Sequence, residues 1–444
     1  MNSRTIAAIS TPQGIGGIAV IRISGSEAVA VADRVFSGSI KNAKSHTVHY
    51  GHIIKNGERI DEVLLTVMLA PRTFTREDTV EISCHGGTAA TYAVLGAVID
   101  AGAYPAEPGE FTKRAFMNGR IDLSQAEAVI DVINAKNELS RRNAVMQLGG
   151  MLSREIKSVR DRLVHLSAQM QVIIDYPDED LEDVDAAEIE RVCRDSLDRV
   201  GRMLKSAENG RMIREGIRCA IVGKPNVGKS SILNCLAGSE RAIVTDIAGT
   251  TRDVIEENVN IDGIPIILSD TAGIRETDDT VEKIGVDRSM QYIDGADIVI
   301  VVTDAETGLD EEDRAVLSAT ENKKRIVLVN KTDIAKGDET LGIAVSAATG
   351  AGMDRLAAEI ARLCRIDEIR AENGMVITNM RHRSALADAY RALTDAADAL
   401  RGGIPTDIVS IDIAAAMDAL GEITGETVSE SIVDEIFHNF CVGK

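Results

Sequence analysis

A phosphate-loop sequence in the middle of the chain constrains the fold more than any other feature. It reads G-K-P-N-V-G-K-S from Gly223 to Ser230, after the apolar segment 217–222 and before the helix-forming S-I-L-N-C-L. This is the G-x-x-x-x-G-K-S pattern in the strand–loop–helix context that it requires, which a chance glycine loop would lack. Glycines let backbone N–H groups surround phosphate oxygens, and the following helix adds positive potential. Lys229 is expected at the β- and γ-phosphates and Ser230 at Mg²⁺. The predicted nucleotide contacts of this loop are Asn226, Val227, Gly228, Lys229, Ser230 and Ser231.

Two later motifs favour guanine as the base. D-T-A-G follows an apolar strand-like segment at Asp270, and N-K-T-D follows another at Asn330. A carboxylate at Asp333 can accept hydrogens from N1 and the exocyclic amine of guanine, whereas adenine would leave this acceptor unpaired. V-S-A, after a further strand, fits the last base-contacting loop. The predicted ligand is therefore GTP, contacted by Asp270, Thr271, Ala272, Gly273, Asn330, Lys331, Asp333, Ser346 and Ala347.

The group that assists hydrolysis is less clear from the residues. Small GTPases usually place a water-orienting glutamine directly after D-T-A-G, but this chain has Ile274, whose aliphatic side chain cannot do that work. Either hydrolysis is slow or another group acts, and the candidates are Asn226 and Glu282. A bound monovalent cation could neutralise charge where other GTPases use an arginine finger. The alternative for Glu282 is a solvated helix face, because several acidic residues precede it.

Composition limits the class of protein. The chain has 444 residues, 44% of them hydrophobic, which suits about three globular domains. No segment reaches the roughly 18 apolar residues of a membrane helix, and the start does not resemble a secretion signal. We therefore expect a cytoplasmic protein without a membrane partner.

The charge is unevenly distributed. Residues 1–118 hold 11 of the 49 Lys and Arg and 11 of the 70 Asp and Glu, so the remainder carries the whole net charge of −21. A contact with RNA would need a local basic patch or a partner protein, because phosphate binding depends on local cations.

The segments around the phosphate loop predict two further kinds of structure. Residues 1–118 alternate apolar and polar residues in short runs, which predicts an α+β domain with a mostly antiparallel sheet. Apolar residues at steps of four and three predict long packed helices on both sides of the G domain: Leu152, Ile156, Val159, Leu163, Leu166, Met170 and Ile173, then Val409, Ile413, Ala416, Leu420 and Ile423. The acidic run 175–185 fits a solvated connection better than a metal site.

The expected fold is multidomain. An α+β domain covers 1–118, a discontinuous all-α helical domain covers 119–212 and 373–444, and an α/β P-loop GTPase domain over 213–372 is inserted in it. Movement of the inserted domain could then tilt helices on both sides.

The end of the chain is predicted to be docked. Val428, Ile432, Ile436 and Phe440 form an apolar stripe that runs almost to the final F-C-V-G-K. A docked tail can deliver Cys441 and Lys444 to a site elsewhere, and the ammonium should lower the pKa of the thiol. Whether Cys441 is a nucleophile, an acid/base or a structural residue stays open.

Several stretches together resemble one family. T-D-I-A-G-T-T-R-D from Thr245 to Asp253, D-T-A-G-I-R-E-T, the terminal F-C-V-G-K and the early A-I-S-T-P-Q-G-I-G-G-I-A-V-I-R-I-S-G are similar to the MnmE (TrmE) family of bacterial tRNA-uridine-modifying GTPases. The resemblance runs along the whole chain. It implies a K⁺ site formed by Asn226, Thr245, Ile247 and Thr250, a Mg²⁺ site of Ser230 and Thr251, and nucleotide contacts that include Asp246, Ala248 and Gly249. It also implies that Glu282 positions the water, and that G domains pair across the nucleotide face.

The same resemblance implies a role for the N-terminal domain. In the family this domain dimerises and binds a one-carbon tetrahydrofolate, 5-formyl- or methylene-tetrahydrofolate, and Arg22, Glu81 and Arg120 match its folate-contacting positions. From the residues alone, outward charge on strands explains Arg22 and Glu81 equally well. The family's tail, C-[small aliphatic]-G-K, reaches the folate cleft, and this chain has Val442 where isoleucine is usual.

The expected function is that of a K⁺-stimulated, homodimeric GTPase in tRNA wobble-uridine modification. The resemblance implies aminomethyl or carboxymethylaminomethyl addition at C5, in a heterotetramer with the flavin-containing protein MnmG (GidA). This chain has no G-x-G-x-x-G flavin fingerprint of its own, which fits a separate flavoprotein. The alternatives are a ribosome-assembly or RNA-binding GTPase switch and a structural adaptor with an inactive GTPase site. The product, the tRNA set, the docking of the partner and the directness of RNA contacts stay open.

Overall fold

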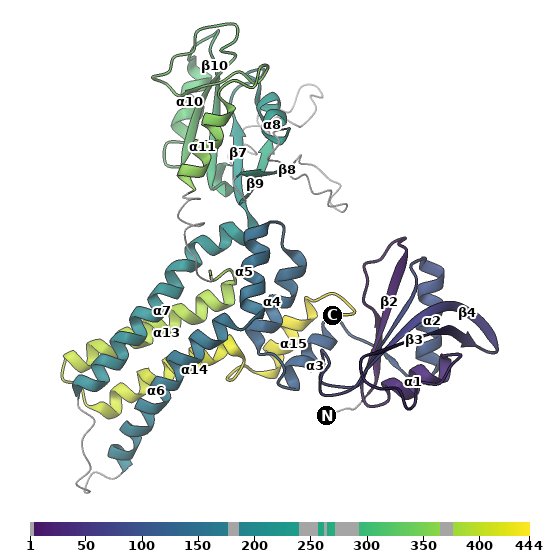
Figure 1. Cartoon of the computed structure of the whole chain (residues 1–444). Helices are drawn as coiled ribbons and strands as arrows, with labels where there is room; N and C mark the ends of the chain where they lie inside the picture. Colours follow the sequence, from purple (N-terminus) through teal and green to yellow (C-terminus); the bar gives the residue numbers. More distant parts are fainter. Residues whose placement is uncertain (1–3, 176–185, 239–255, 262–263, 271–292, 365–375) are drawn as a thin grey trace. The chain divides into compact units, whose positions relative to one another are not determined.

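The structure is a computed structural model, and it describes residues 4–175, 186–238, 256–261, 264–270, 293–364 and 376–444 (Figure 1). The chain divides into two compact units. One comprises Met1–Ile133, Val145–Leu197 and Asp388–Lys444, and the other comprises Asn134–Ala144 and Asp198–Ala387. Among the described residues, none of the helices combines the length and the apolar character needed to span a bilayer.

The first unit begins with a six-stranded sheet in the order β3-β4-β5-β2-β1-β6. All its pairings are antiparallel except that of β1 with β6. Alternate residues such as Ile21, Leu65 and Ile82 are buried, because one face of the sheet packs on helices α1 and α2. This confirms the predicted α+β domain. Its elements are β1 Ile6–Ile9, β2 Ile18–Ser24, α1 Ala28–Val35, β3 Thr47–Lys55, β4 Glu58–Met68, β5 Thr79–His85, α2 Thr88–Asp100 and β6 Tyr104–Pro105.

Helices follow the sheet domain. They are α3 Glu110–Met117, α4 Leu123–Asn134, α5 Glu138–Leu148, α6 Met151–Asp175, α7 Ala186–Glu215, α13 Met380–Arg401, α14 Thr406–Thr424 and α15 Glu430–His438. α4 begins directly after Asp122, whose Oδ1 accepts hydrogen bonds from the Ser124 hydroxyl and the Gln125 N–H and so caps the helix.

The predicted apolar seams are confirmed. α6 packs against α14, and the seam residues whose side chains the structure describes are at most 2% exposed. The side chain of Ile173 lies outside the described residues, as does most of the acidic run 175–185.

The predicted stripe at the end of the chain is wrong in part. The buried apolar side chains of α15 and the tail are Val433, Phe437 and Phe440, whereas Ile432 is 44% exposed. Val428 and Phe440 lie outside α15, and the two predicted residues within it, Ile432 and Ile436, are four apart and so about 40° apart around the helix, which carries Ile432 off the buried face. Val428 and Ile436 only flank the cluster. The expectation of a docked tail is nevertheless confirmed by its hydrogen bonds, which are described below.

The second unit contains a six-stranded sheet in the order β12-β11-β10-β7-β9-β8. Its strands are parallel except for the antiparallel pair β8–β9. Val222, Asp304 and Asn330 end neighbouring parallel strands, so the loops that follow leave the sheet at one edge. The elements are β7 Ile217–Val222, α8 Lys229–Ala237, β8 Glu256–Ile261, β9 Ile264–Asp270, β10 Ile298–Asp304, α10 Glu311–Ala319, β11 Arg325–Asn330, β12 Ile343–Ala344 and α11 Met353–Leu363.

A single residue joins this sheet to the helices. α7 ends at Glu215, β7 begins at Ile217, and Gly216 between them has φ +90°. A Cβ at Gly216 would lie 2.7 Å from the Pro265 carbonyl oxygen of β9, so glycine is required for both conformation and space. The connectivity confirms the fold class: an α+β domain and a helical domain with an inserted α/β domain. The residue boundaries predicted for the three domains stay predictions.

Candidate functional site

The phosphate loop has the geometry expected of a phosphate cradle. Gly223 and Gly228 have φ +149° and +97°, and a Cβ at Gly223 would lie 2.3 Å from the Val302 carbonyl oxygen. Lys229 Nζ donates to the carbonyl oxygens of Gly223 at 2.7 Å and Lys224 at 2.8 Å, so its ammonium lies inside the loop. Asn226 is exposed with φ +63°, at the tip of the loop. The loop thus surrounds an ammonium with backbone groups, as a site for a polyphosphate requires.

The base loop lies against the phosphate loop. Asn330 is buried; its Nδ2 donates to the Val227 carbonyl oxygen at 2.8 Å, and its Oδ1 accepts from the Ala347 N–H at 3.1 Å. The Ser346 hydroxyl donates to Asp333 Oδ1 at 2.7 Å and orients this exposed carboxylate. Five residues predicted from separate motifs therefore meet: Val227, Asn330, Asp333, Ser346 and Ala347. The arrangement suits recognition of a guanine edge by a fixed carboxylate.

Lys331 is held by a residue that the sequence analysis missed. Its Nζ contacts Asp304 Oδ2 at 2.6 Å, and the Glu306 N–H donates to Asp304 Oδ1 at 2.9 Å. Burial alone would raise the pKa of Asp304, but these hydrogen bonds outweigh it and keep the pKa below its ordinary value. Asp304 is therefore an anionic support for the base loop.

Other predicted residues of this site cannot be placed. Thr245, Asp246, Ile247, Ala248, Gly249, Thr250, Thr251, Thr271, Ala272, Gly273 and Glu282 lie outside the described residues, as does the side chain of Asp270. Within the described part of the chain, no group of three or more His, Cys, Asp and Glu residues is arranged to hold a metal ion.

A second group of predicted residues meets in the first unit. Arg22 Nε and Nη2 both contact Glu81 Oε1 at 2.8 Å, from the paired positions of β2 and β5. The Arg22 guanidinium lies 5.7 Å from the ring centroid of Phe111, and that of Arg120 lies 4.7 Å from the centroid of Phe74. Phe111 belongs to a small buried cluster with Ile6 and Ala8, and Phe74 packs against the same cluster. Two arginines stacked on rings, one of them paired with a carboxylate, can bind a planar ligand that carries carboxylates.

The tail brings Cys441 to this region. The Ser10 hydroxyl donates to the Gly443 carbonyl oxygen at 3.0 Å, and the N–H groups of Gly109 and Phe111 donate to the carbonyl oxygens of Cys441 at 3.3 Å and Lys444 at 3.2 Å. Cys441 itself is exposed. The backbone of the tail from Cys441 to Lys444 is therefore held against the segment from Gly109 to Phe111, and the ring of Phe111 contacts the Arg22 guanidinium.

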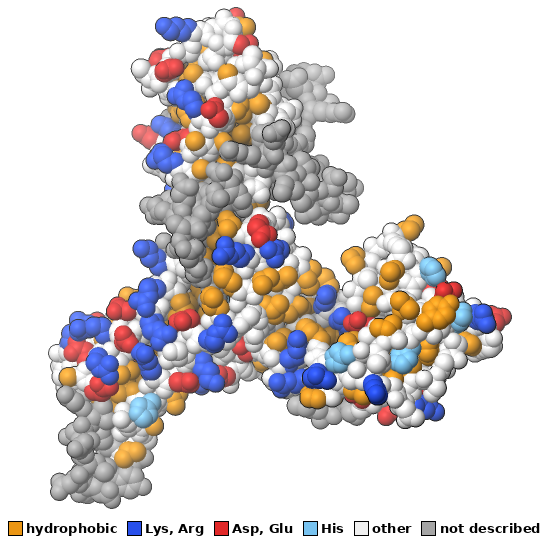
Figure 2. Space-filling model, viewed as in Figure 1, with side chains coloured by type: hydrophobic (Ala, Val, Ile, Leu, Met, Phe, Trp, Pro, Cys, Tyr) orange, Lys and Arg blue, Asp and Glu red, His pale blue; other side chains and the backbone are white. Residues whose placement is uncertain are grey.

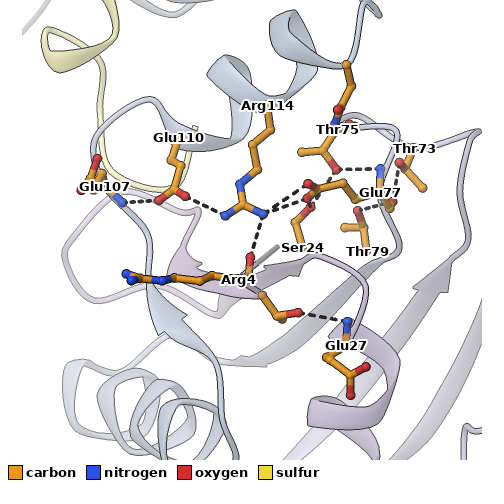
Figure 3. A network of polar contacts seen from close by, with 12 residues as sticks. Arg4, Ser24, Glu27, Thr73, Thr75, Glu77, Thr79, Glu107, Glu110 and Arg114 are labelled. Carbon is orange, nitrogen blue, oxygen red and sulfur yellow. Dashed lines mark hydrogen bonds and ion pairs between the residues drawn. The ribbon is translucent and has the colours of Figure 1, made fainter. Parts of the chain in front are cut away.

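A polar network supports the helix that holds the tail, and sequence reasoning missed it. Figure 3 shows Arg114 of α3 donating to the Arg4 carbonyl oxygen at 2.9 Å, to Glu77 at 3.1 Å and to Glu110 at 2.7 Å. The Ser24 hydroxyl donates to the same Glu77 at 2.7 Å. The network fixes α3 on the sheet domain, and so fixes the amides that bind the tail.

The chain has a phosphate loop after β7 and a guanine-type loop after β11. Both lie in a domain that is inserted, in chain order, between helices that follow an α+β domain. These features define a multidomain P-loop GTPase. Residues 5–120 match the family described as the GTP-binding protein TrmE N-terminus, and residues 123–441 match the family described as the MnmE helical domain. The chain belongs to the MnmE (TrmE) family and is a GTPase of that family.

Full-length relatives agree with this assignment. The chain is 49% identical over 456 residues to a tRNA modification GTPase MnmE of Acetivibrio thermocellus, with 99% of each chain covered. It is 46% identical over 452 residues to the protein of the same name from Lactobacillus delbrueckii subsp. bulgaricus, covering 99% of this chain and 98% of that one. Among solved structures, Aquifex aeolicus Era is 28% identical and covers 40% of this chain and 66% of its own, with a TM-score of 0.27.

Proposed function

We propose that this GTPase acts in the modification of tRNA wobble uridine at C5, using a one-carbon tetrahydrofolate and a flavoprotein partner. The observation that carries the proposal is the docked tail, in which the carbonyl oxygens of Cys441 and Lys444 accept hydrogen bonds from the N–H groups of Gly109 and Phe111. The ring of Phe111 in turn contacts Arg22, which is paired with Glu81. Full-length relatives named as tRNA modification GTPases support the same reaction class. In this proposal GTP hydrolysis drives domain movement, and the chemistry on the base takes place at the folate site.

Residues of the sheet domain and of the segment after α3 fit a folate. Arg22 and Arg120 offer guanidinium groups for the glutamate tail or a carbonyl edge, and Glu81 offers a carboxylate for the pterin amino edge. When bound, the folate supplies the carbon that is added to the base. We propose that the docked tail delivers the Cys441 thiol and the Lys444 ammonium to the folate site, and we assign a direct chemical role to Cys441.

The GTPase site is proposed to use two metal ions. Mg²⁺ is assigned to Ser230 and Thr251, and K⁺ to Asn226, Thr245, Ile247 and Thr250, of which the structure describes Ser230 and Asn226. The exposed position of Asn226 at the loop tip leaves its amide oxygen accessible to a cation. Glu282 is proposed to position the attacking water.

The assembly is proposed to be a cytoplasmic homodimer that forms a heterotetramer with the flavoprotein MnmG (GidA). Figure 2 shows basic side chains over the helices, but Arg141, Arg191 and Arg194 form ion pairs with glutamates three or four residues earlier. These pairs reduce the local positive charge that RNA would need, so a partner that shares the tRNA contact fits this surface.

The decisive experiment is to trace a labelled one-carbon folate into tRNA with the purified protein and MnmG. Label in C5-modified wobble uridine is expected, and it should be absent for Cys441→Ser while GTP turnover continues. Label that enters equally with Cys441→Ser would contradict a direct role of the thiol.

Potassium dependence tests the proposed mechanism of GTP hydrolysis. GTP turnover should be much faster in K⁺ than in Na⁺, by up to roughly 10³–10⁵ if the ion replaces an arginine finger. Equal turnover rates in K⁺ and Na⁺, or an obligate monomer that turns over GTP as fast as the dimer, would contradict the proposed K⁺ site and G-domain pairing. Equal rates in the two salts would favour the structural adaptor with an inactive GTPase site.

The second candidate is an RNA-binding or ribosome-assembly switch. A deletion strain that keeps its modified wobble nucleoside would favour it. The acidic charge of residues 119–444 argues against it, because such switches need basic RNA-binding surface.

A further inference from the structure

Lys224 is a residue of the phosphate loop for which the sequence pattern specifies no role. Its backbone carbonyl accepts one of the two hydrogen bonds by which Lys229 Nζ is held, while its own side chain points to another element. Lys224 Nζ contacts Asp310 Oδ2 at 2.6 Å, Asp313 Oδ2 at 2.9 Å and the Thr307 hydroxyl at 3.2 Å. The three contacts use all three N–H donors of the ammonium.

The acceptors of Lys224 are themselves fixed. Asp310 and Asp313 form the capping box of α10: Asp310 Oδ1 accepts from the Asp313 N–H at 3.0 Å, and Asp313 Oδ2 accepts from the Asp310 N–H at 3.3 Å. The Asp313 side chain is 1% exposed and that of Lys224 only 12%. Contact with Lys224 lowers the pKa of Asp310 to about 2, and contact with the two aspartates raises the pKa of Lys224. Asp310 and Lys224 are therefore both charged at neutral pH.

The loop is thus held on two sides by elements outside its own motif. Lys224 fixes its first half to α10, and Asn330 fixes its second half through the Val227 carbonyl oxygen. The residues between these two points, from Pro225 to Asn226, are exposed. The base loop has a matching support, because Lys331 is held by Asp304 at the end of β10. The segment from Asp304 to Asp313 therefore contacts one lysine of each nucleotide-binding loop.

We propose that Lys224, with Asp310 and Asp313, is a positioning residue for GTP binding: the ion pairs hold the phosphate loop in the conformation that accepts the phosphates. The lysine does not contact the nucleotide in this proposal. It reduces the number of loop conformations that binding must exclude, so its loss weakens affinity without altering the chemistry at the γ-phosphate.

The test is nucleotide affinity in four variants of the full chain, measured by titration with a fluorescent GDP analogue. Lys224→Met keeps the aliphatic stem and removes the charge, and it is expected to weaken GDP binding about tenfold. Lys224→Arg restores the charge and should recover affinity to within roughly threefold of the parent. Asp310→Asn keeps a good helix cap, and its GDP affinity should lie between those of Lys224→Met and Lys224→Arg. Lys323→Met is the matched control and should bind like the parent, because Lys323 is a half-buried lysine of the same unit that pairs with Asp294.

A second readout separates positioning from general damage to the domain. The preference for GTP over ITP depends on Asp333, which Lys224 does not touch, so Lys224→Met should keep this ratio while affinity falls. GDP affinity within about twofold of the parent in Lys224→Met would overturn the proposal, as would an equal loss in Lys323→Met. If Lys224→Met does not fold, parent-like affinity in Asp310→Asn overturns it instead.

Discussion

At the scale of single residues, His85 and Asp61 form a pair whose charge depends on pH. His85 Nδ1 lies 2.6 Å from Asp61 Oδ1, and the His85 N–H donates to Asp61 Oδ2 at 2.8 Å. The hydrogen bond to Asp61 raises the pKa of His85 above its ordinary value of 6.5, and the charge of Glu62 adds to the shift. Because the pKa of His85 is raised in the folded state, the pair stabilises the domain fully just below about pH 6.5, and this contribution is lost as the pH rises through the folded pKa of His85. It is also lost in acid, as the pH falls through the lowered pKa of Asp61.

We expect Asp61→Asn to lower the pKa of His85 towards 6.5, because the amide carries no charge. The measurement is a titration of the His85 ring by NMR. His49→Gln, a change to another histidine of the same sheet, is the control and should leave the His85 titration in place. An unchanged His85 titration in Asp61→Asn would show that the pair has no electrostatic effect.

Single residues also mark what sequence reasoning could and could not find. Asn330 and Asp333 were found because their motif has fixed spacing and fixed chemistry. Lys224 and Asp304 were missed, since their partners lie 86 and 27 residues away and no local pattern reveals them. The Asp310-x-x-Asp313 spacing of a capping box was the one available indication.

At the scale of elements, the tail depends on a glycine. Gly443 has φ +91°, and a Cβ there would lie 2.2 Å from the Ile9 carbonyl oxygen. We expect Gly443→Ala to detach the tail and to reduce the yield of modified nucleoside, with faster hydrogen exchange in 439–444. Gly403→Ala is the matched control: Gly403 has φ +73° but no atom within 4 Å of an added Cβ. Slow exchange in 439–444 of Gly443→Ala would contradict the docking described here.

The α6–α14 seam gives a second prediction at this scale. Leu163 is fully buried, whereas the adjacent Val164 is 43% exposed. Leu163→Ala should lower the local stability of α6 and α14 by about 2–5 kcal/mol, because it leaves a cavity. Val164→Ala should change it by less than about 0.5 kcal/mol. Hydrogen exchange of the two helices checks this without assuming two-state unfolding of a multidomain chain. Equal losses of local stability in Leu163→Ala and Val164→Ala would show that Leu163 does not lie in the buried contact between α6 and α14.

The elements show why one periodic pattern succeeded and another failed. The α6 seam alternates steps of four and three over many turns, which keeps one face buried on a 3.6-residue helix. α15 is only nine residues long and is followed by a turn, so the buried Phe440 belongs to the tail rather than to a helical stripe. Short terminal helices take their orientation from tertiary contacts, here with Phe116 and Leu123, which spacing does not encode.

At the scale of the whole molecule, the joint at Gly216 connects the GTPase sheet to a 30-residue helix without a linker. We expect insertion of Gly-Ser-Gly after Gly216 to leave GDP affinity near the parent value and to reduce the yield of modified nucleoside, because a slack joint no longer transmits movement. The control is the same insertion after Gly57, in the β3–β4 turn, where an added Cβ meets nothing within 4 Å. It should change neither the GDP affinity nor the yield of modified nucleoside. An unchanged yield of modified nucleoside in the variant with the insertion after Gly216 would show that movement of the GTPase domain is not transmitted through this joint.

The overall plan of the molecule was predictable because each domain has its own periodicity and the phosphate loop fixes the sheet around it. That the tail docks on the N-terminal part of the chain was predictable only from the family resemblance, since the contact joins residues from opposite ends of the sequence. Physical reasoning from spacing has no access to such distant contacts.

The exposure of Cys441 gives the chain a built-in attachment point for a reporter. Cys84, Cys193, Cys219 and Cys364 are buried, and burial raises the pKa of each of these thiols, that of Cys193 to about 11 and that of Cys364 to about 12. Cys235 is half-buried in α8. A maleimide dye at neutral pH would therefore label the tail first, and its fluorescence would follow the tail through a round of nucleotide turnover in the unmutated protein.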